Sequence, residues 1–226
     1  MIVKVCGMTK PANIREVVEA GAQWIGMIFW NKSPRYVPMQ GIMAGIVPDK
    51  SSLAKDVFGS AKRVGVFVDD TPQSIITHAV QFHLDYIQLH GQESSTLIRN
   101  LKETLLPNLC PGIKFIKALS IKHSDDLACW EEYRHCADYL LFDTKCSCVG
   151  GSGHKFNWQL LEQYHGDIPF LLSGGISEED ALAISTLHHP MLHGIDLNSR
   201  FETAPGIKDA KRIQSFIQTL NRHEQD

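Results

Sequence analysis

Short, β-rich apolar segments alternate with longer stretches of helical periodicity along this 226-residue chain. Such alternation is typical of βαβ units, in which each helix carries the chain back to the start of the next parallel strand. The predicted strands are Val3–Cys6, Trp24–Phe29, Arg63–Phe67, Tyr86–Leu89, Phe115–Ala118, Tyr139–Phe142, Phe170–Leu172 and Gly194–Leu197. The predicted helices are Ala12–Ala20, Pro72–Phe82, Ser94–Leu105, Ser124–Tyr133, Trp158–Tyr164, Glu178–Thr186 and Lys208–Leu220.

Two of these helices have clear start signals. Thr71 precedes Pro72, which suits an N-cap followed by proline at the first helical position. Ser177 is followed by three acidic residues, and the helix dipole favours negative charge in a first turn. The segment between the second and third strands is richer in proline and glycine, and there we predict only a short helix at Met39–Val47.

Eight strand candidates without a dividing linker predict one domain over residues 1–226, either a closed barrel or an open, doubly wound sheet. The open sheet would carry a glycine-rich phosphate loop directly after the first strand. Here the first strand ends instead in Cys6-Gly7-Met8-Thr9, and the glycine clusters follow the sixth and seventh strands. Barrels commonly bind phosphate after strands seven and eight. We therefore predict a single, parallel eight-stranded (β/α)8 TIM barrel.

Composition excludes several classes of partner. The formal net charge is −3 and no basic block occurs, so we expect no nucleic-acid partner. No apolar run approaches the roughly 20 residues of a membrane span, so we expect no membrane partner. The six cysteines are scattered and the N-terminus does not have the pattern of a secretory leader, which predicts a reducing, cytoplasmic location.

Two strand ends carry candidates for acid–base chemistry, because barrel active sites lie at the carboxyl ends of the strands. The first strand ends at Cys6, with Lys4 on the same face as a possible source of a positive field that would favour the thiolate. The sixth strand leads to Asp143, whose burial would suit a general acid. The alternatives are a small buried hydrophobe for Cys6 and a helix-capping or loop carboxylate for Asp143.

Other polar residues at the same end are candidates for substrate binding. His90 follows the fourth strand, where Gln88 also lies, and Asp196 ends the eighth. Arg35 lies on the loop after the second strand, and its fork of N–H donors would suit a ligand carboxylate. The alternative for Arg35 is an ordinary surface arginine.

Glycine-rich loops predict a phosphate site. Backbone N–H groups in such loops, or at a helix N-terminus, bind phosphate without a basic side chain. A single glycine pair is a common turn, but glycine clusters follow both the sixth and the seventh strands, and Asn198 and Ser199 follow the eighth. The predicted phosphate-binding residues are Gly151, Ser152, Gly153, Gly174, Gly175, Asn198 and Ser199.

Cys146 and Cys148 stand near His154, which raises the question of a metal. Zinc sites usually need a second ligand pair at recognisable spacing, and none is found. We interpret these cysteines as loop thiols and expect no metal.

Taken in order, the segments resemble the phosphoribosylanthranilate isomerase family of tryptophan biosynthesis over essentially the whole chain. Each segment alone is weak, but the ordered set is specific. The matching segments are KVCGMT (Lys4–Thr9), KSPRYV (Lys32–Val37), VGVFVD (Val64–Asp69), QLHG (Gln88–Gly91), LLFDT (Leu140–Thr144), GGSGHKFNW (Gly150–Trp158), LSGGI (Leu172–Ile176) and GIDLNSRFETAPGIKD (Gly194–Asp209).

The resemblance implies an Amadori rearrangement of a phosphorylated aminosugar, N-(5'-phosphoribosyl)anthranilate, without a cofactor. By position it implies that Asp143 is the general acid and Cys6 the general base. It also implies that Arg35 holds the anthranilate carboxylate and that Asp196 contacts the substrate. The glycine loops and the Asn198–Ser199 pair match the family's phosphate cradle, with the loop at 150–153 closing over the site.

Some positions depart from the family pattern. Arg200 and Phe201 stand where a glycine and a small aliphatic residue are expected, which leaves the shape of the phosphate loop open. Asn157 replaces an aspartate and Ser173 replaces an alanine.

Two other functions compete with this one. A barrel isomerase of histidine biosynthesis would be expected to carry a pair of aspartates, as acid and base, on the first and fifth strands. Cys6 at the end of the first strand argues against this function. A barrel that only senses a sugar phosphate would lack an acid or a base, whereas candidates for both are present. Oligomeric state is left open between a monomer and a homodimer.

Overall fold

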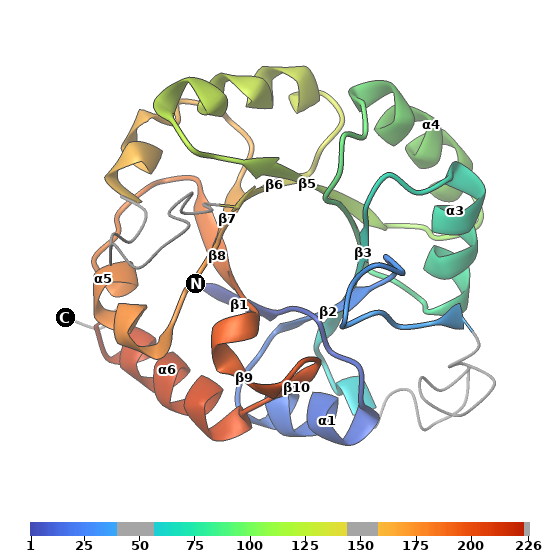
Figure 1. The fold of residues 1–226 in the computed structure, drawn as a ribbon. Coiled ribbons are helices and arrows are strands. Elements are labelled where there is room, and N and C mark those ends of the chain that lie inside the picture. Colours follow the sequence, from blue (N-terminus) through green and yellow to red (C-terminus); the bar gives the residue numbers. More distant parts are fainter. Residues whose placement is uncertain (40–56, 144–157, 224–226) are drawn as a thin grey trace.

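The computed structural model describes residues 1–39, 57–143 and 158–223. Within them eight parallel strands, each hydrogen-bonded to the next in chain order, close into a barrel because β8 pairs with β1 (Figure 1). This confirms the closed barrel over the open sheet. The strands are β1 (Ile2–Val5), β2 (Trp24–Ile28), β3 (Lys62–Phe67), β4 (Tyr86–Leu89), β5 (Lys114–Ser120), β6 (Tyr139–Asp143), β7 (Phe170–Ser173) and β8 (Leu192–Leu197).

Helices surround the barrel and follow its strands along the chain (Figure 1). The α-helices are α1 (Pro11–Glu19), α3 (Pro72–Gln81), α4 (Ser95–Leu105), α5 (Ala181–Ser185) and α6 (Ala210–His223). Short 3-10 helices are η2 (Ser124–Tyr133), η3 (Trp158–Gln163), η4 (Glu178–Asp180) and η5 (Ser199–Phe201). No helix in the described ranges has both the length and the apolar character needed to cross a membrane.

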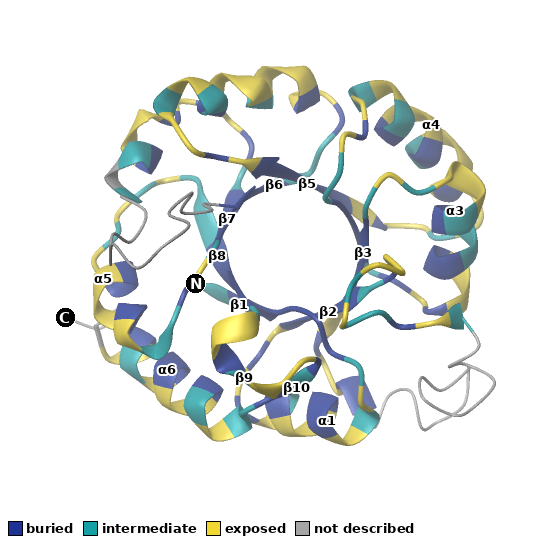
Figure 2. Ribbon diagram, in the orientation of Figure 1, coloured by how far each residue is buried: buried dark blue, intermediate teal, exposed yellow. Residues whose placement is uncertain are grey.

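The main core lies between the barrel and its helices. The helix faces turned toward the strands are buried and the opposite faces are exposed (Figure 2). In α4, Ile98, Leu101 and Leu105 form the buried stripe at the helical spacing that the periodicity predicts. This packing fixes the strand ends that carry the candidate site.

A second core fills the barrel itself. Trp24, Tyr86 and Tyr139 are the first residues of β2, β4 and β6, and their rings pack together at the amino-terminal end of the barrel. Trp24 lies 4.1 Å from Tyr86 and 5.4 Å from Tyr139 between ring centroids. Large rings on alternate strands fill this end, as in other barrels. The polar residues are thereby concentrated at the other end.

All eight predicted strands are confirmed, with ends that differ by one or two residues. The predicted helix at Ser124–Tyr133 is a 3-10 helix, and the one at Glu178–Thr186 is a 3-10 turn that continues into α5. A short antiparallel pair, β9 (Glu202–Ala204) and β10 (Ile207–Lys208), was not predicted. Lys208 therefore lies in a strand, whereas the sequence suggested the start of the last helix. The predicted helix at Met39–Val47 lies, after Met39, outside the described residues.

Both predicted helix starts are confirmed. The Thr71 side chain accepts a hydrogen bond from Ser74 N, with Pro72 in the first turn of α3. Asp180 accepts hydrogen bonds from both the backbone N–H and the hydroxyl of Ser177, each at 2.8 Å. These side chains satisfy backbone donors that the first turn of a helix leaves open.

Candidate active site

The candidate acid and base lie at the same end of the barrel, on strands that β7 and β8 separate in the ring. Cys6 directly follows β1, and Asp143 is the last residue of β6; both are buried. Strand register joins them stepwise, since Asp143 is level with Ser173, Ser173 with Asp196, and Asp196 with Lys4. The carboxyl end of this wall of the barrel is therefore a continuous row of polar side chains.

Lys4 and Asp196 form an ion pair inside the barrel. Lys4 Nζ donates to Asp196 Oδ1 at 2.8 Å, and the lysine side chain is fully buried. Burial alone would lower the pKa of Lys4, but Asp196 and, less strongly, Cys6 outweigh it and raise that pKa. Lys4 therefore stays charged beside the thiol.

Burial raises the pKa of the Cys6 thiol, and this outweighs the opposing attraction of Lys4 and Lys208. Lys4 does lower the thiol pKa, as the sequence suggested, but burial, and to a lesser extent the charge of Asp196, raises that pKa by more. Gly26 on the neighbouring strand makes room for the thiol, since a Cβ there would lie 2.9 Å from Cys6 Sγ. Burial thus opposes ionisation of Cys6, whereas Lys4 and Lys208 favour it.

Asp143 contacts His90, a pairing that the sequence did not predict. His90 Nε2 lies 3.3 Å from Asp143 Oδ2. On its other side, His90 Nδ1 lies 3.0 Å from Gln88 Nε2. His90, predicted to bind substrate, is thus placed against the candidate acid and remains half-buried at the mouth of the barrel.

Arg35 reaches the site but is already engaged by a carboxylate. Its Nε donates to Glu202 Oε1 at 2.7 Å, and its Nη2 donates to Glu202 Oε2. Lys208 Nζ donates to Glu202 Oε1 from the other side at 2.6 Å. Burial would raise the pKa of Glu202, but Arg35, Lys208 and Gly206 N–H outweigh it and hold that pKa at about 2.

The Arg35 side chain lies over Gly7, directly after Cys6. Gly7 has a φ of +77°, and a Cβ there would lie 2.5 Å from Arg35 Cδ. Glycine is therefore required at this position both for the backbone conformation and for the path of the arginine. Arg35 is therefore not an ordinary surface arginine, which was the alternative interpretation.

The predicted phosphate residues follow adjacent strands. Gly174 and Gly175 come directly after β7 with φ values of +106° and +66°, and Asn198 and Ser199 come directly after β8. Asn198 Oδ1 accepts a hydrogen bond from Lys208 Nζ at 2.8 Å, so the amide is fixed with its nitrogen directed elsewhere. These loops directly follow β7 and β8, the strands that carry Ser173 and Asp196 of the polar row.

The departures near this loop have a structural explanation at one position. Phe201 is fully buried, and its ring packs edge-on against Phe216 of α6 at 5.2 Å. The phenylalanine thus anchors η5 to α6 beneath the loop, while Arg200 is exposed.

Several predicted residues lie outside the described part of the chain. They are Gly151, Ser152 and Gly153 of the phosphate site, Asn157, and the thiols Cys146 and Cys148 with His154. Across residues 1–39, 57–143 and 158–223, no three His, Cys, Asp or Glu side chains lie where together they could hold a metal ion.

Glu202, Lys208 and the Gln88–His90 contact were missed as parts of the site. The sequence segments that carry them were singled out, but nothing in the spacing indicates which side chains meet across the barrel mouth.

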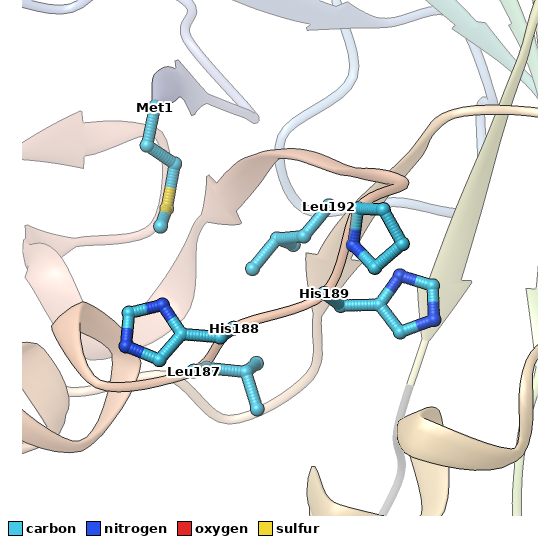
Figure 3. Close-up of a pocket in the computed structure, with 6 residues that line it drawn as sticks. Met1, Leu187, His188, His189 and Leu192 are labelled. Carbon is cyan, nitrogen blue, oxygen red and sulfur yellow. The ribbon is translucent and has the colours of Figure 1, made fainter.

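A pocket of about 440 Å³ lies elsewhere (Figure 3). It is lined by Met1, Leu192 and residues 187–190, at the amino-terminal ends of β1 and β8. It is therefore at the opposite end of the barrel from Asp143.

A closed (β/α)8 barrel with a carboxyl group, a thiol and glycine-bearing loops at the carboxyl ends of its strands has the arrangement of a barrel enzyme. Comparison with known families makes this specific. The model of the N-(5'-phosphoribosyl)anthranilate (PRA) isomerase family matches residues 3–219. The chain belongs to this family and is an isomerase.

Relatives and solved structures agree. The chain is 43% identical over 220 residues to the N-(5'-phosphoribosyl)anthranilate isomerase of Parabacteroides distasonis, covering 97% of this chain and 93% of that protein. It is 41% identical to that of Phocaeicola vulgatus, covering 98% of each. The Thermotoga maritima phosphoribosyl anthranilate isomerase crystal structure superposes with a TM-score of 0.77 at 30% identity, covering 98% of this chain and 100% of that one.

A further crystal structure of phosphoribosyl anthranilate isomerase was solved in complex with reduced 1-(o-carboxyphenylamino)-1-deoxyribulose 5-phosphate. It superposes on this chain with a TM-score of 0.76 at 29% identity, covering 98% of this chain and 100% of that one.

Proposed function

We propose that this chain converts N-(5'-phosphoribosyl)anthranilate into 1-(2-carboxyphenylamino)-1-deoxyribulose 5-phosphate, a step of tryptophan biosynthesis, with Asp143 as general acid and Cys6 as general base. The observation that carries the assignment is the placement of these two buried groups at one end of the barrel, in a chain of this isomerase family. One acid and one base in separate environments are what the rearrangement requires.

The acid step opens the sugar ring. Asp143 delivers its proton to the furanose ring oxygen as the bond from that oxygen to C1' breaks. The nitrogen lone pair of the anthranilate amine then forms the C1'–N double bond of a Schiff base. A carboxyl group at the carboxyl end of an apolar strand, beside His90, is placed where barrel enzymes carry out their chemistry.

The base step moves a proton from C2'. Cys6 accepts that proton as thiolate, the C–H electrons form a C1'–C2' double bond, and the Schiff-base electrons return to nitrogen. The resulting enol-amine ketonises to the product. Lys4 and Lys208 supply positive charge near the thiolate, which supports this state although burial opposes it.

Binding groups surround these two residues. Arg35 is proposed to hold the anthranilate carboxylate, since Nη1 is not part of its pair with Glu202 and an arginine fork suits a carboxylate. Gly174, Gly175, Asn198 and Ser199 are proposed to cradle the phosphate, together with residues 151–153. Asp196 and His90 are proposed to contact the substrate beside the acid and base.

The test is the loss of anthranilate-moiety fluorescence when the purified chain meets freshly generated phosphoribosylanthranilate. We expect rapid loss with the wild-type chain. The Asp143→Asn variant should be slower by roughly 10²- to 10⁴-fold, the range for a lost general acid, with unchanged affinity for the reduced product analogue. Binding of that analogue without turnover by the wild type would point to a sensor. If the chain converts only the aminoaldose of histidine biosynthesis, that compound is its substrate and the proposed substrate is wrong.

Location and assembly belong to the same proposal. The free thiols among the described residues support a location in the reducing cytoplasm. They are Cys6, Cys110, Cys129 and Cys136. The Thermotoga maritima isomerase has been described as dimeric. For this chain we propose a monomer or a homodimer, which analytical ultracentrifugation distinguishes.

A further inference from the structure

Gln88 is a fully buried amide inside the barrel, on β4. Its Nε2 lies 3.0 Å from His90 Nδ1. Its Oε1 is buried and has no hydrogen-bond partner among the described residues. An unpaired, buried amide oxygen costs free energy of folding. We therefore interpret the contact with His90 as the reason for an amide at this position.

This contact determines which ring nitrogen of His90 carries the proton. The amide nitrogen of Gln88 is a donor only, so His90 Nδ1 must present its lone pair. The imidazole proton is then on Nε2, which lies 3.3 Å from Asp143 Oδ2. The ring therefore donates toward the carboxyl group, through Oδ2 alone.

A fixed donor on Oδ2 has a consequence for the acid. When Asp143 is protonated, Oδ2 accepts from His90 as the carbonyl oxygen, and the acidic proton resides on Oδ1. When Asp143 has given that proton to the substrate, the same Nε2–H stabilises the carboxylate. One tautomer of His90 thus serves both states of the acid, as an orienting partner does for other catalytic groups.

We propose that Gln88 is a positioning residue for the acid step: it holds His90 as the Nε2–H tautomer, which directs the transferable proton of Asp143 to Oδ1. The inference rests on the proposed role of Asp143. It assigns to Gln88 a function beyond filling the barrel, and it gives His90 a role toward Asp143 in addition to contact with substrate.

The first test needs no substrate. Imidazole 15N chemical shifts, with the His90 signals assigned through a His90→Asn variant, distinguish the two neutral tautomers and the imidazolium. At pH 7.5 we expect the Nε2–H tautomer in the wild type and a mixture in Gln88→Met, which keeps the side-chain length but removes the donor. An Nδ1–H tautomer or an imidazolium in the wild type would overturn the proposal, as would an unchanged tautomer in Gln88→Met.

The second test is kinetic. Gln88→Met should lower kcat by roughly tenfold, a smaller effect than loss of the acid itself, and should change KM by less than about threefold, because the residue acts through His90. The matched control is Ile116→Val. Ile116 of β5 lies level with Gln88, is buried in the apolar cluster inside the barrel and is not one of the proposed site residues.

We expect Ile116→Val to keep kcat within about twofold, since it changes interior packing by one methylene without touching a hydrogen bond. An equal loss of kcat in the control would assign the effect to packing and overturn the proposal. A wild-type chain that shows the Nε2–H tautomer yet does not turn over phosphoribosylanthranilate would instead remove the proposed function and leave the Gln88–His90 assignment intact.

Discussion

Arg35 and Glu202 are joined by a pair of parallel hydrogen bonds, Nε to Oε1 at 2.7 Å and Nη2 to Oε2, although 167 positions separate them in the sequence. The carboxylate is fixed in turn by Lys208, at 2.6 Å. Such a bidentate pair orients a guanidinium group as well as stabilising it. The arginine is therefore held over Gly7 before any ligand arrives.

Replacing Arg35 tests its role in binding. Arg35→Ala should raise KM roughly 10- to 100-fold, which corresponds to the loss of a charge-assisted hydrogen bond of about 1.5–3 kcal/mol, with a smaller change in kcat. Steady-state kinetics on phosphoribosylanthranilate measures both. Glu202→Gln, which keeps a neutral acceptor beside the arginine, should raise KM less. An unchanged KM in Arg35→Ala would remove the residue from the carboxylate site.

The positions of the acid and base were predictable, whereas the partners of Arg35 and Asp143 were not. The apolar strands predict the positions of Cys6, Asp143 and Asp196, because each lies at the carboxyl end of a strand. In a parallel barrel all of these ends lie on the same side. The pairing of Arg35 with Glu202 depends on two loops that meet only after the barrel closes, and no local pattern encodes it.

The net field at Cys6 could not be predicted for a different reason. Lys4 lies on the same face, as the period of a strand requires, but its charge is balanced by Asp196, which arrives from β8. Whether the pKa of a thiol rises or falls depends on the difference between burial and such balanced charges. The sequence supplies the charges but not the burial.

A raised thiol pKa predicts how the rate depends on pH. If Cys6 acts as thiolate, kcat/KM should rise by about tenfold per pH unit through the neutral and mildly alkaline range, because kcat/KM reports the ionisation of the free enzyme. A pH series from about 6.5 to 9 measures this. The charged groups around the thiol are Lys4, Asp196 and Lys208: the pKa of Lys4, which pairs with Asp196, is raised, whereas burial lowers the pKa of Lys208 although it pairs with Glu202. A flat profile over that range would contradict the assignment.

Serine at the same position is the companion experiment. Cys6→Ser keeps the size and polarity of the side chain, but a hydroxyl is a far weaker base near neutral pH. We expect turnover to fall by at least about 10²-fold, within the range for a lost general base, with the thermal unfolding midpoint nearly unchanged. Wild-type turnover in Cys6→Ser would assign the proton transfer to another group.

The ion pair inside the barrel predicts an asymmetric effect on stability. Lys4→Met should lower the free energy of unfolding by about 3–5 kcal/mol, because it leaves the carboxylate of Asp196 buried without its partner. The double variant Lys4→Met/Asp196→Leu should recover part of this loss, since no buried charge remains. Urea unfolding of the three chains measures the difference. A double variant less stable than the single one would contradict this account.

Because the imidazole of His78 is buried, we expect the protein to lose stability in mild acid. Its ring is buried among Phe29, Phe67 and Phe82, and Nε2 has no hydrogen-bond partner within the described residues. Burial lowers the pKa of His78, so the folded protein keeps the ring neutral while the unfolded chain takes up a proton below about pH 6.5. Stability should therefore fall as the pH drops below that value, by at most about 1.4 kcal/mol per unit for this one group.

His78→Leu should flatten this dependence between about pH 6.5 and 5, whatever it does to the absolute stability, because leucine binds no proton in either state. Urea unfolding at several pH values measures the slope. The matched control is His165→Gln, since His165 is exposed and should leave the slope as it is in the wild type. Burial also lowers the pKa of His193, so part of the slope should persist in His78→Leu. An unaltered slope in that variant would show that His78 is protonated equally in the folded and unfolded chains.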